Sequence, residues 1–579
     1  MNQPILYLLS LMYIFEDYLI LSLAKNTLPK TTFFVLLGLV VFLNATGVFN
    51  DILEPDGTLY ASIARHLVKS NNWMDLWGKG ADWLDKPHMP FWLAAISLKL
   101  IGINAFAYKL PSFIFFIVSL IYAYKLTVCI YNEATARLAV LIYASSLHII
   151  ISNFDGKAEI YLAAFIIAAI YHIYKAIEKK WLYHIVLGAL FCACAVMTKG
   201  LFSLITIAAG FVIYWIKTKQ WNEFFNPKWY VLLLLVMVFI LPELYSLYTQ
   251  FDLHPEKIVF GKTNVSGLKF FFWDSQFGRF FNNGPIKGSG DPLFFIHTTL
   301  WAFLPSTILF LYALSRLFLT KKTPARNDYR WMIGGSAFTT FLIFSLSKFQ
   351  LPHYIIILFP HFSMITAAWL LETAAEKTLK KINAFQTILF VLLIAVIVWI
   401  MLLYRFENIT WFVILLVLIS MITFFYKPEN MLVAILKKNI GFALLIAVFL
   451  NCLLYPSILQ YQSGMMAAKW LNGQPTRMPV VFHNCEPSSL DFYYHGNVRY
   501  TTDKPFEPRQ IASNDSSLLF ASLSSLKALP QDTLEFTVLK TFPHFRVSKL
   551  NIRFLNHQTR SAELDTFALA IVKRKTYRN

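Results

Sequence analysis

The stretch Phe385–Tyr404, FQTILFVLLIAVIVWIMLLY, contains no charged side chain. As a helix it would be about 30 Å long, which matches the hydrocarbon core of a bilayer. Similar apolar runs recur almost to residue 456. Because lipid cannot satisfy open backbone groups, such runs form helices. The sequence therefore predicts an all-α polytopic membrane protein over most of its length.

Composition excludes an ordinary soluble protein of this size, since 57% of the 579 residues are hydrophobic and 14% are charged. The net charge of +19 could suggest nucleic acid, but Lys and Arg lie in short segments between apolar runs and form no single basic face. This pattern is typical of topology signals, so we expect no nucleic-acid partner. Of the five cysteines, only Cys485 lies in a polar region, which leaves no intradomain disulfide or cysteine metal site there.

Run length and flanking residues predict about thirteen spans. They centre on residues 32–49, 105–124, 136–153, 158–177, 182–197, 201–216, 229–249, 293–315, 331–347, 353–371, 385–404, 409–426 and 439–455. Residues 1–31 form an N-terminal segment of open role, either an interfacial helix or an over-extended start. Glu16 and Asp17 make it a poor span.

Loop charges predict the orientation of the spans. With the N-terminus placed in the cytoplasm, the inside loops are rich in Lys and Arg. The short outside loops carry one cation each, namely Lys157, Lys199, Lys348 and Arg405. This asymmetry predicts an odd number of spans and a C-terminus outside.

Three polar regions then share the outer face. Two are loops, 50–104 and 250–292, of a multi-span domain over 32–456, and the third is the tail 457–579. The tail alternates strand-like and helical stretches and has roughly 120 residues, enough for an independent α/β domain. Its expected strands are Pro479–His483, Val498–Thr501, Leu518–Ala521, Phe536–Leu539 and Phe567–Val572, with helices at Met465–Leu471 and Pro487–Tyr494.

The first outer loop contains two candidate segments. Glu54–Arg65 reads EPDGTLYASIAR and places Asp56 before a helix-like repeat. Its plainer interpretation is an N-cap, in which Asp56 accepts from free backbone N–H groups. Trp83–Trp92 reads WLDKPHMPFW, where Lys86 follows an acid beside prolines and aromatics. A lysine snorkelling at an aromatic belt is the alternative there.

Two further segments place charge at the outer membrane boundary. Asn153–Lys157 reads NFDGK, and its Asp155 is either a site carboxylate or a turn-forming Asp-Gly. Phe271–Phe281 reads FFWDSQFGRFF, in which Arg279 could stack on aromatics or bind a lipid-linked phosphate, with simple interfacial anchoring as the alternative.

These groups are more informative together than singly. Two carboxylates and several cations converge on one face, while the predicted spans hold almost no ionisable residue. An ion-coupled transporter would be expected to bury such groups at mid-membrane. The pattern therefore favours interfacial chemistry on a lipid-borne substrate.

Four motifs resemble those of the GT-C glycosyltransferases that use polyprenyl-phosphate sugars. The resemblance is strongest to the bacterial branch with the lipid A aminoarabinose transferase and its protein mannosyltransferase relatives. The motifs are Asp56–Arg65, Asp82–Trp92, Met197–Gly200 (MTKG) and Ser347–Tyr354 (SKFQLPHY). The family also has about thirteen spans and a C-terminal exoplasmic α/β domain, which agrees with the pattern of runs.

The resemblance implies an inverting glycosyltransferase of the bacterial inner membrane with an extracytoplasmic active site. It would transfer a sugar from a polyprenyl-phosphate donor to lipid A, another glycan or a protein. It implies catalytic roles for Asp56 and Asp155 and donor-phosphate binding by Lys86, Arg279, Lys199 and Tyr354. Further candidates are Asp85, Tyr60, Lys348 and His353. The rival function is a lipid or polysaccharide transporter.

The chain departs from the family pattern at three positions. Gly57 and Leu59 stand where the family often has Glu and Arg, so an acid pair and a phosphate-binding Arg are missing there. Asp85 shortens the acid of the family's Glu-Lys-Pro segment. Some relatives bind a divalent metal near that acid, and the shortening disfavours one here. We therefore expect no cofactor and no metal site.

Overall fold

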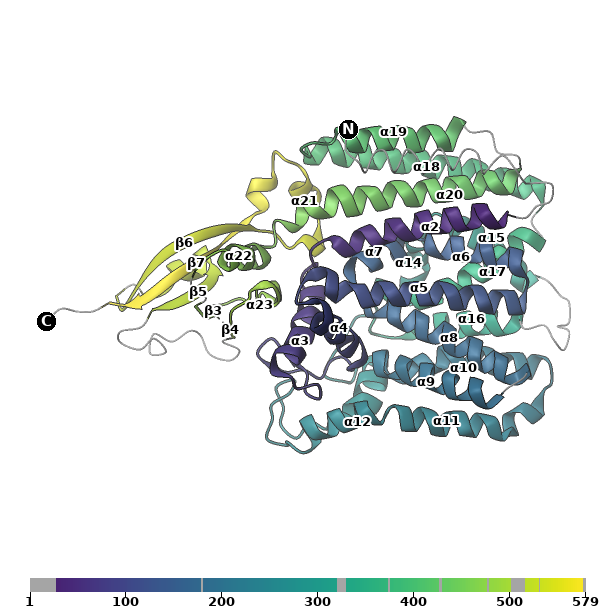
Figure 1. The fold of residues 1–579 in the computed structure, drawn as a ribbon, viewed down its shortest axis with the longest axis horizontal. Coiled ribbons are helices and arrows are strands. Elements are labelled where there is room, and N and C mark those ends of the chain that lie inside the picture. Colours follow the sequence, from purple (N-terminus) through teal and green to yellow (C-terminus); the bar gives the residue numbers. More distant parts are fainter. Residues whose placement is uncertain are drawn as a thin grey trace. The chain divides into compact units, whose positions relative to one another are not determined.

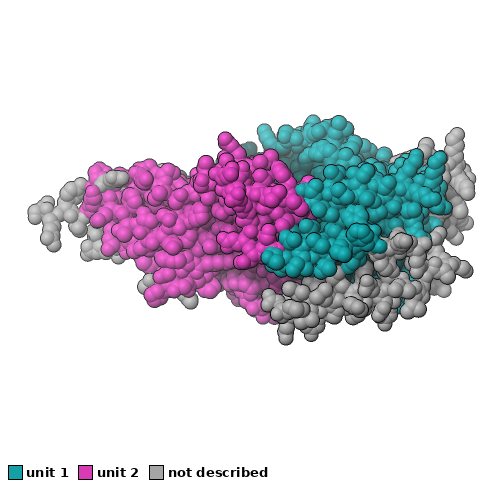
Figure 2. Space-filling view, turned by 90° about the horizontal axis from the view of Figure 1, so that it is seen from above, with its two compact units in different colours: residues 1–48, 112–395, 410–449 teal, residues 49–111, 396–409, 450–579 magenta. Residues whose placement is uncertain are grey.

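The computed structural model describes most of the chain, with short gaps between its ranges. The described residues are 28–178, 181–319, 330–372, 375–425, 430–475, 478–500, 516–530 and 532–575. The predicted N-terminal segment 1–31 lies almost wholly outside them. The chain divides into two compact units, coloured in Figure 2. Unit 1 comprises residues 1–48, 112–395 and 410–449, and unit 2 comprises 49–111, 396–409 and 450–579.

Unit 1 is helical (Figure 1). Its helices are α2 (Lys30–Thr46), η1 (Gly47–Phe49), which ends one residue past the unit, α6 (Glu133–Ala144), α7 (Leu147–Asp155), α8 (Ala158–Glu178), α9 (Trp181–Lys199), α10 (Phe202–Lys217), η2 (Trp221–Phe225), α11 (Pro227–Phe239), α12 (Leu241–Leu247), η3 (Tyr248–Asp252), α13 (Gly267–Lys269), η4 (Phe270–Gly278), α14 (Phe294–Ala302), α15 (Thr307–Leu319), α16 (Arg330–Leu346), η5 (Pro352–Leu358), α17 (Phe359–Glu372), α19 (Thr410–Phe425) and α20 (Met431–Val448). Two long helices, α5 (Ala105–Ile130) and α18 (Glu376–Tyr404), run across the unit boundaries.

The predicted multi-pass helical architecture is confirmed, but the count of thirteen spans is not. Within the described ranges, eight helices are long and apolar enough to cross a membrane, and the α6–α7 pair, bent by 58°, is a ninth candidate. Several predicted spans form shorter or broken helices. The run at 201–216 gives the 16-residue α10, and the run at 293–315 is divided between α14 and α15.

Helix burial shows which spans lie at the centre of unit 1. In α8, 83% of the most apolar window is buried, and in the η5–α17 span the share is 89%. In α18 it is only 28%, as expected for a helix that faces lipid. The α8 helix and the η5–α17 span therefore lie at the centre of unit 1. The α8 helix also packs against η5.

Unit 2 combines the first outer loop with the C-terminal region. The loop forms α3 (Asp56–Ser70), the hairpin β1 (Trp77–Gly78) with β2 (Ala81–Asp82), and α4 (Met89–Ile101). The C-terminal helices are η6 (Phe449–Leu454), which begins one residue before the unit, α21 (Tyr455–Leu459), α22 (Ser463–Asn472), α23 (Ser488–Tyr493), α24 (Leu523–Lys527), η8 (Val547–Lys549), α25 (Ile552–Leu555) and η9 (Arg560–Glu563).

The C-terminal region contains a five-stranded mixed sheet in the order β4-β3-β5-β7-β6. Its strands are β3 (Val480–Phe482), β4 (Val498–Arg499), β5 (Ser517–Ser522), β6 (Leu534–His544) and β7 (Asp565–Arg574). The pairs β3–β4 and β3–β5 are parallel, while β5–β7 and β6–β7 are antiparallel. All five predicted strands and both predicted helices are confirmed, and with them the α/β class of this region.

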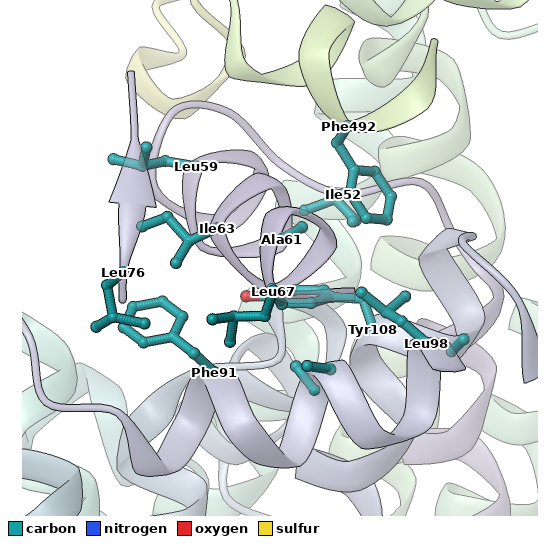
Figure 3. Packing of buried hydrophobic residues seen from close by; sticks show 14 residues of the cluster. Ile52, Leu59, Ala61, Ile63, Leu67, Leu76, Phe91, Leu98, Tyr108 and Phe492 are labelled. Carbon is teal, nitrogen blue, oxygen red and sulfur yellow. The ribbon is translucent and has the colours of Figure 1, made fainter. Parts of the chain in front are cut away.

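The residue ranges of the two compact units differ from those of the predicted domains. Residues 49–111 group with the C-terminal region, whereas the boundary at 456 had assigned this loop to the multi-span domain. Figure 3 shows the physical reason, an apolar cluster in which Phe492 of α23 packs with residues of α3 and α4. Burying that shared surface stabilises the loop and the C-terminal region as one unit. The predicted boundary at residue 456 between a multi-span domain and a separate tail domain stays a prediction.

Candidate functional site

The turn between α7 and α8 gathers charged side chains. Gly156 takes a left-handed conformation (φ 67°) that ends α7, so the predicted Asp-Gly turn is confirmed. Lys157 Nζ lies 2.7 Å from Asp155 Oδ2. Asp155 is buried, and its Oδ1 has no hydrogen-bond partner among the described residues. A buried carboxylate oxygen without a donor is a candidate substrate-binding atom.

Glu159, one turn further along, is the centre of the cluster. Its buried carboxylate forms an ion pair with Lys199, and Oε1 lies 3.6 Å from His353 Nε2. Lys199 Nζ also lies 3.8 Å from the centre of the Tyr354 ring, within cation–π range. One lysine is thus held between a carboxylate and an aromatic face. The arrangement joins the MTKG motif to the SKFQLPHY motif.

Backbone geometry explains the glycine of the MTKG motif. Lys199 is the last residue of α9, and Gly200 has a φ of +99°, which other residues rarely adopt. A Cβ at this position would lie 2.0 Å from Nε2 of Gln276, which donates to the Lys199 carbonyl at 3.4 Å. The glycine therefore lets the chain turn while Gln276 packs against it.

The SKFQLPHY segment connects α16 to η5. The Lys348 amide donates to the Phe280 carbonyl at 3.1 Å, next to Arg279 in the chain. The Arg279 guanidinium lies 5.5 Å from the ring of Phe349. Residues 348–349 of this segment therefore contact residues 279–280. Pro352, at the start of η5, then leads into the adjacent His353 and Tyr354.

The remaining predicted residues lie in unit 2. Asp56 is exposed and begins α3, while Pro55 occupies the N-cap, so the N-cap interpretation of Asp56 is wrong. Asp85 and Lys86 are partly buried and form an ion pair of 3.1 Å. The Tyr60 ring packs edge-on against Phe91 at 5.5 Å. Asp56 is the acid in the first turn of α3, where a carboxylate interacts favourably with the helix dipole, and its catalytic role stays a prediction.

The sequence prediction missed several buried ionisable residues. Glu159 and Glu243 lie within predicted spans, and so does Lys109, whose Nζ donates to the carbonyls of Asn50 and Asp51 at 2.9 and 3.0 Å. The expectation that the spans hold almost no ionisable residue is therefore wrong. An acid inside an apolar run is itself a functional signal. By that rule Glu159 could have been found from the sequence.

The last two features are a buried carboxyl group near Asp56 and the arrangement of potential metal ligands. Burial raises the pKa of Glu54, two residues before Asp56. Among the described residues, no group of three or more His, Cys, Asp or Glu side chains is placed to hold a metal ion. The expectation of no metal site stays a prediction.

The chain is similar to several known proteins. The family model for dolichyl-phosphate-mannose-protein mannosyltransferases matches residues 85–245. An uncharacterised protein of Aquifex aeolicus is 26% identical over 57% of this chain and 62% of its own length. The undecaprenyl phosphate-alpha-4-amino-4-deoxy-L-arabinose arabinosyl transferase of Shewanella sediminis is 26% identical over 45% of this chain and 46% of its own length. The match thus spans less than two thirds of these relatives.

Solved structures resemble the chain over nearly its full length. The crystal structure of ArnT from Cupriavidus metallidurans bound to undecaprenyl phosphate superposes with a TM-score of 0.72 at 15% identity, covering 93% of this chain and 98% of that one. The apo structure of the same protein gives the same score. The chain therefore has the ArnT fold, and its predicted resemblance to the polyprenyl-phosphate glycosyltransferases is confirmed.

Proposed function

We propose that the chain is an integral-membrane glycosyltransferase that moves a sugar from a polyprenyl-phosphate donor to a lipid, glycan or protein acceptor. The observation that carries the proposal is the cluster of Asp155, Lys157, Glu159, Lys199, His353 and Tyr354. It joins two separate motifs of the resemblance, MTKG and SKFQLPHY, to the turn between α7 and α8. The names of the relatives and the fold support the same activity.

Three cations, Lys199, Arg279 and Lys86, serve the donor phosphate in this proposal. Each is positioned by a neighbour, namely Glu159, Phe349 or Asp85. Stabilising charge that develops on the leaving phosphate is usually the largest catalytic contribution. The phosphate competes with Glu159 for Lys199, and Tyr354 keeps the lysine in place during that exchange.

The transfer step follows from these assignments. The acceptor oxygen attacks the anomeric carbon while the bond from that carbon to the phosphate oxygen breaks. The bonding electrons leave with the phosphate, and a hydroxyl acceptor gives its proton to Asp56. Asp155 helps to position the substrates. A single displacement of this kind inverts the sugar. An acceptor phosphate is already largely ionised near pH 7, so it would need Asp56 less.

The direct test of the function compares cells with and without the gene. Mass spectrometry of envelope glycolipids and glycoproteins should show a missing hexose, pentose or amino-sugar increment in the deletion strain. The acceptor that loses the increment identifies the substrate. Unchanged glycans together with accumulation of an intact lipid-linked precursor would favour the transporter. No comparison supports that alternative.

We predict that phosphate recognition is specific at two cations. Arg279→Lys and Lys86→Ala should each lower turnover at least tenfold, about 1.4 kcal/mol in the barrier, because a planar fork and a point charge are not interchangeable at a phosphate. Purified variants assayed with a saturating donor give the rates. The matched control is Arg405→Ala, an exposed cation in no motif, which should stay within about twofold. Equal small effects at all three positions would reduce Lys86 and Arg279 to interfacial anchors.

The inner-membrane location and the side of the active site belong to the proposal as well. A reporter fused after Lys219, between α10 and α11, should behave as cytoplasmic. A reporter fused after residue 579 should behave as extracytoplasmic, because the charge asymmetry of the loops sets the topology. Both reporters on one side would contradict an odd number of spans.

A further inference from the structure

One side chain of the C-terminal region forms hydrogen bonds with the backbone just before Asp56. Gln462 is fully buried. Its Nε2 donates to the Ile52 carbonyl at 2.9 Å, and its Oε1 accepts from the Glu54 amide at 2.7 Å. An amide side chain that uses both its donor and its acceptor fixes the direction of the chain as well as its place. The Gln462 side chain therefore holds residues 52–54 at two points immediately before α3.

An ion pair holds α3 further along, at Arg65. Arg65 Nη1 donates to Asp491 Oδ1 of α23 at 2.9 Å, and both side chains are almost completely buried. Arg65 Nη2 also donates to the Tyr494 carbonyl at 2.6 Å. The second oxygen of Asp491 lies 3.0 Å from His66 Nε2 and accepts from the Tyr500 hydroxyl at 3.0 Å. Both carboxylate oxygens of Asp491 and both terminal nitrogens of Arg65 have hydrogen-bond partners, which gives the ion pair a defined geometry.

Apolar packing joins these two points. Figure 3 shows Phe492 beside Ile52 and above Tyr108, in the cluster that also contains Leu59 and Leu67 of α3. The Tyr493 hydroxyl accepts from the Ile52 amide at 2.8 Å. Asp56 lies in sequence between the Gln462 contacts and the Arg65 contact, so the C-terminal region holds α3 on both sides of it.

Electrostatics argue that the ion pair does more than add stability. Burial lowers the pKa of Arg65, with the Asp491 charge opposing it. Burial alone would raise the pKa of Asp491, but His66 and Arg65 hold it below its usual value. A buried ion pair often gives no more stability than apolar residues of the same volume would. What it provides is direction, because its hydrogen bonds form at only one orientation of α3.

We propose that Gln462 and Asp491 are positioning residues for the transfer reaction, which act through α3 to place the Asp56 carboxylate. The proposal rests on the proposed function, in which Asp56 orients or deprotonates the acceptor. It gives the C-terminal α/β region a role in catalysis without contact to the substrate. A displacement of the carboxylate by about 1 Å can cost a hundredfold in rate.

The test uses the purified full chain with a polyprenyl-phosphate sugar. Gln462→Ala and Asp491→Asn should lower kcat at least tenfold while the donor KM stays within about threefold. Milder variants guard against misfolding, since Gln462→Met keeps the length of the buried side chain while it removes the two hydrogen bonds, and Tyr500→Phe removes only one bond to Asp491. These should lower kcat about threefold to fivefold. The matched control is Ser463→Ala, which removes a buried 2.9 Å hydrogen bond to His544 inside the C-terminal region. It should lower thermal stability without changing kcat.

A double-mutant cycle shows whether Gln462 acts through Asp56. In an Asp56→Asn background, Gln462→Ala should cause no further loss of the residual single-turnover rate, because the positioned group is already missing. Additive losses, or losses matched by Ser463→Ala, would overturn the positioning role and leave a structural one. An inactive wild-type protein would instead contradict the proposed function itself.

Discussion

Replacing Asp56 by Asn should lower transfer to a hydroxyl acceptor at least a hundredfold, while donor binding and expression stay unchanged. The amide keeps the size of the side chain and loses its charge, so it cannot take a proton. General-base catalysis typically contributes a factor of about 10² to 10⁴. The rate follows from a single-turnover assay with labelled donor, and donor binding from isothermal titration with the polyprenyl phosphate.

Asp75→Asn is the matched control for this variant. Asp75 lies in the same outer loop and accepts from the Asn72 side chain at 2.8 Å, in none of the four motifs. It should keep activity within about twofold, as expected for a surface hydrogen bond outside the site. An Asp56→Asn protein as active as the Asp75→Asn protein would return Asp56 to the role of an acid in the first turn of a helix.

Removing Glu159 should have the largest effect on stability. Glu159→Ala leaves Lys199 partly buried without its counter-ion, and breaking a buried pair in this way costs about 3 kcal/mol. Turnover should fall together with stability. Thermal unfolding in detergent and the transfer assay measure the two effects.

Two comparisons separate the stability of the pair from its function. The double variant Glu159→Gln with Lys199→Met should recover most of the stability, because no unpaired charge remains, yet stay at least tenfold slower than wild type. Glu133→Gln breaks an exposed 3.0 Å pair with Arg137 and should lower stability far less than Glu159→Ala does. Full activity in the stable double variant would remove Lys199 from the site.

Local patterns predicted the C-terminal region well. Its strands are short apolar runs, such as Leu518–Ala521, bounded by polar segments, and β5 covers that run with one residue more at each end. The predicted span count is not confirmed, and one reason is equally local. Hydropathy treats 293–315 as one run, but the helix is interrupted between Ala302 and Thr307. A proline at position 305 cannot donate within the helix, which permits the break.

Pairings between distant residues could not be predicted from local pattern. Lys199 meets Glu159 across 40 residues, and Arg65 meets Asp491 across 426. The sequence singled out Lys199 and Arg65 within motifs, but it contains no local signal for their partners. As an acid in an apolar run, Glu159 was recognisable as a functional residue but not as the partner of Lys199, and Asp491 lies in a helix without a motif. Both pairings depend on how the elements pack.

The central claim is that the chain breaks the bond between a sugar and a polyprenyl phosphate and forms a new glycosidic bond. Proteoliposomes with the purified chain, a radiolabelled polyprenyl-phosphate sugar and an envelope extract as acceptor source test it directly. The account predicts that label moves to the acceptor with inverted configuration, that free polyprenyl phosphate appears in equal amount, and that Asp56→Asn prevents both. Donor that crosses the membrane intact, with no polyprenyl phosphate released, would contradict it and identify a transporter.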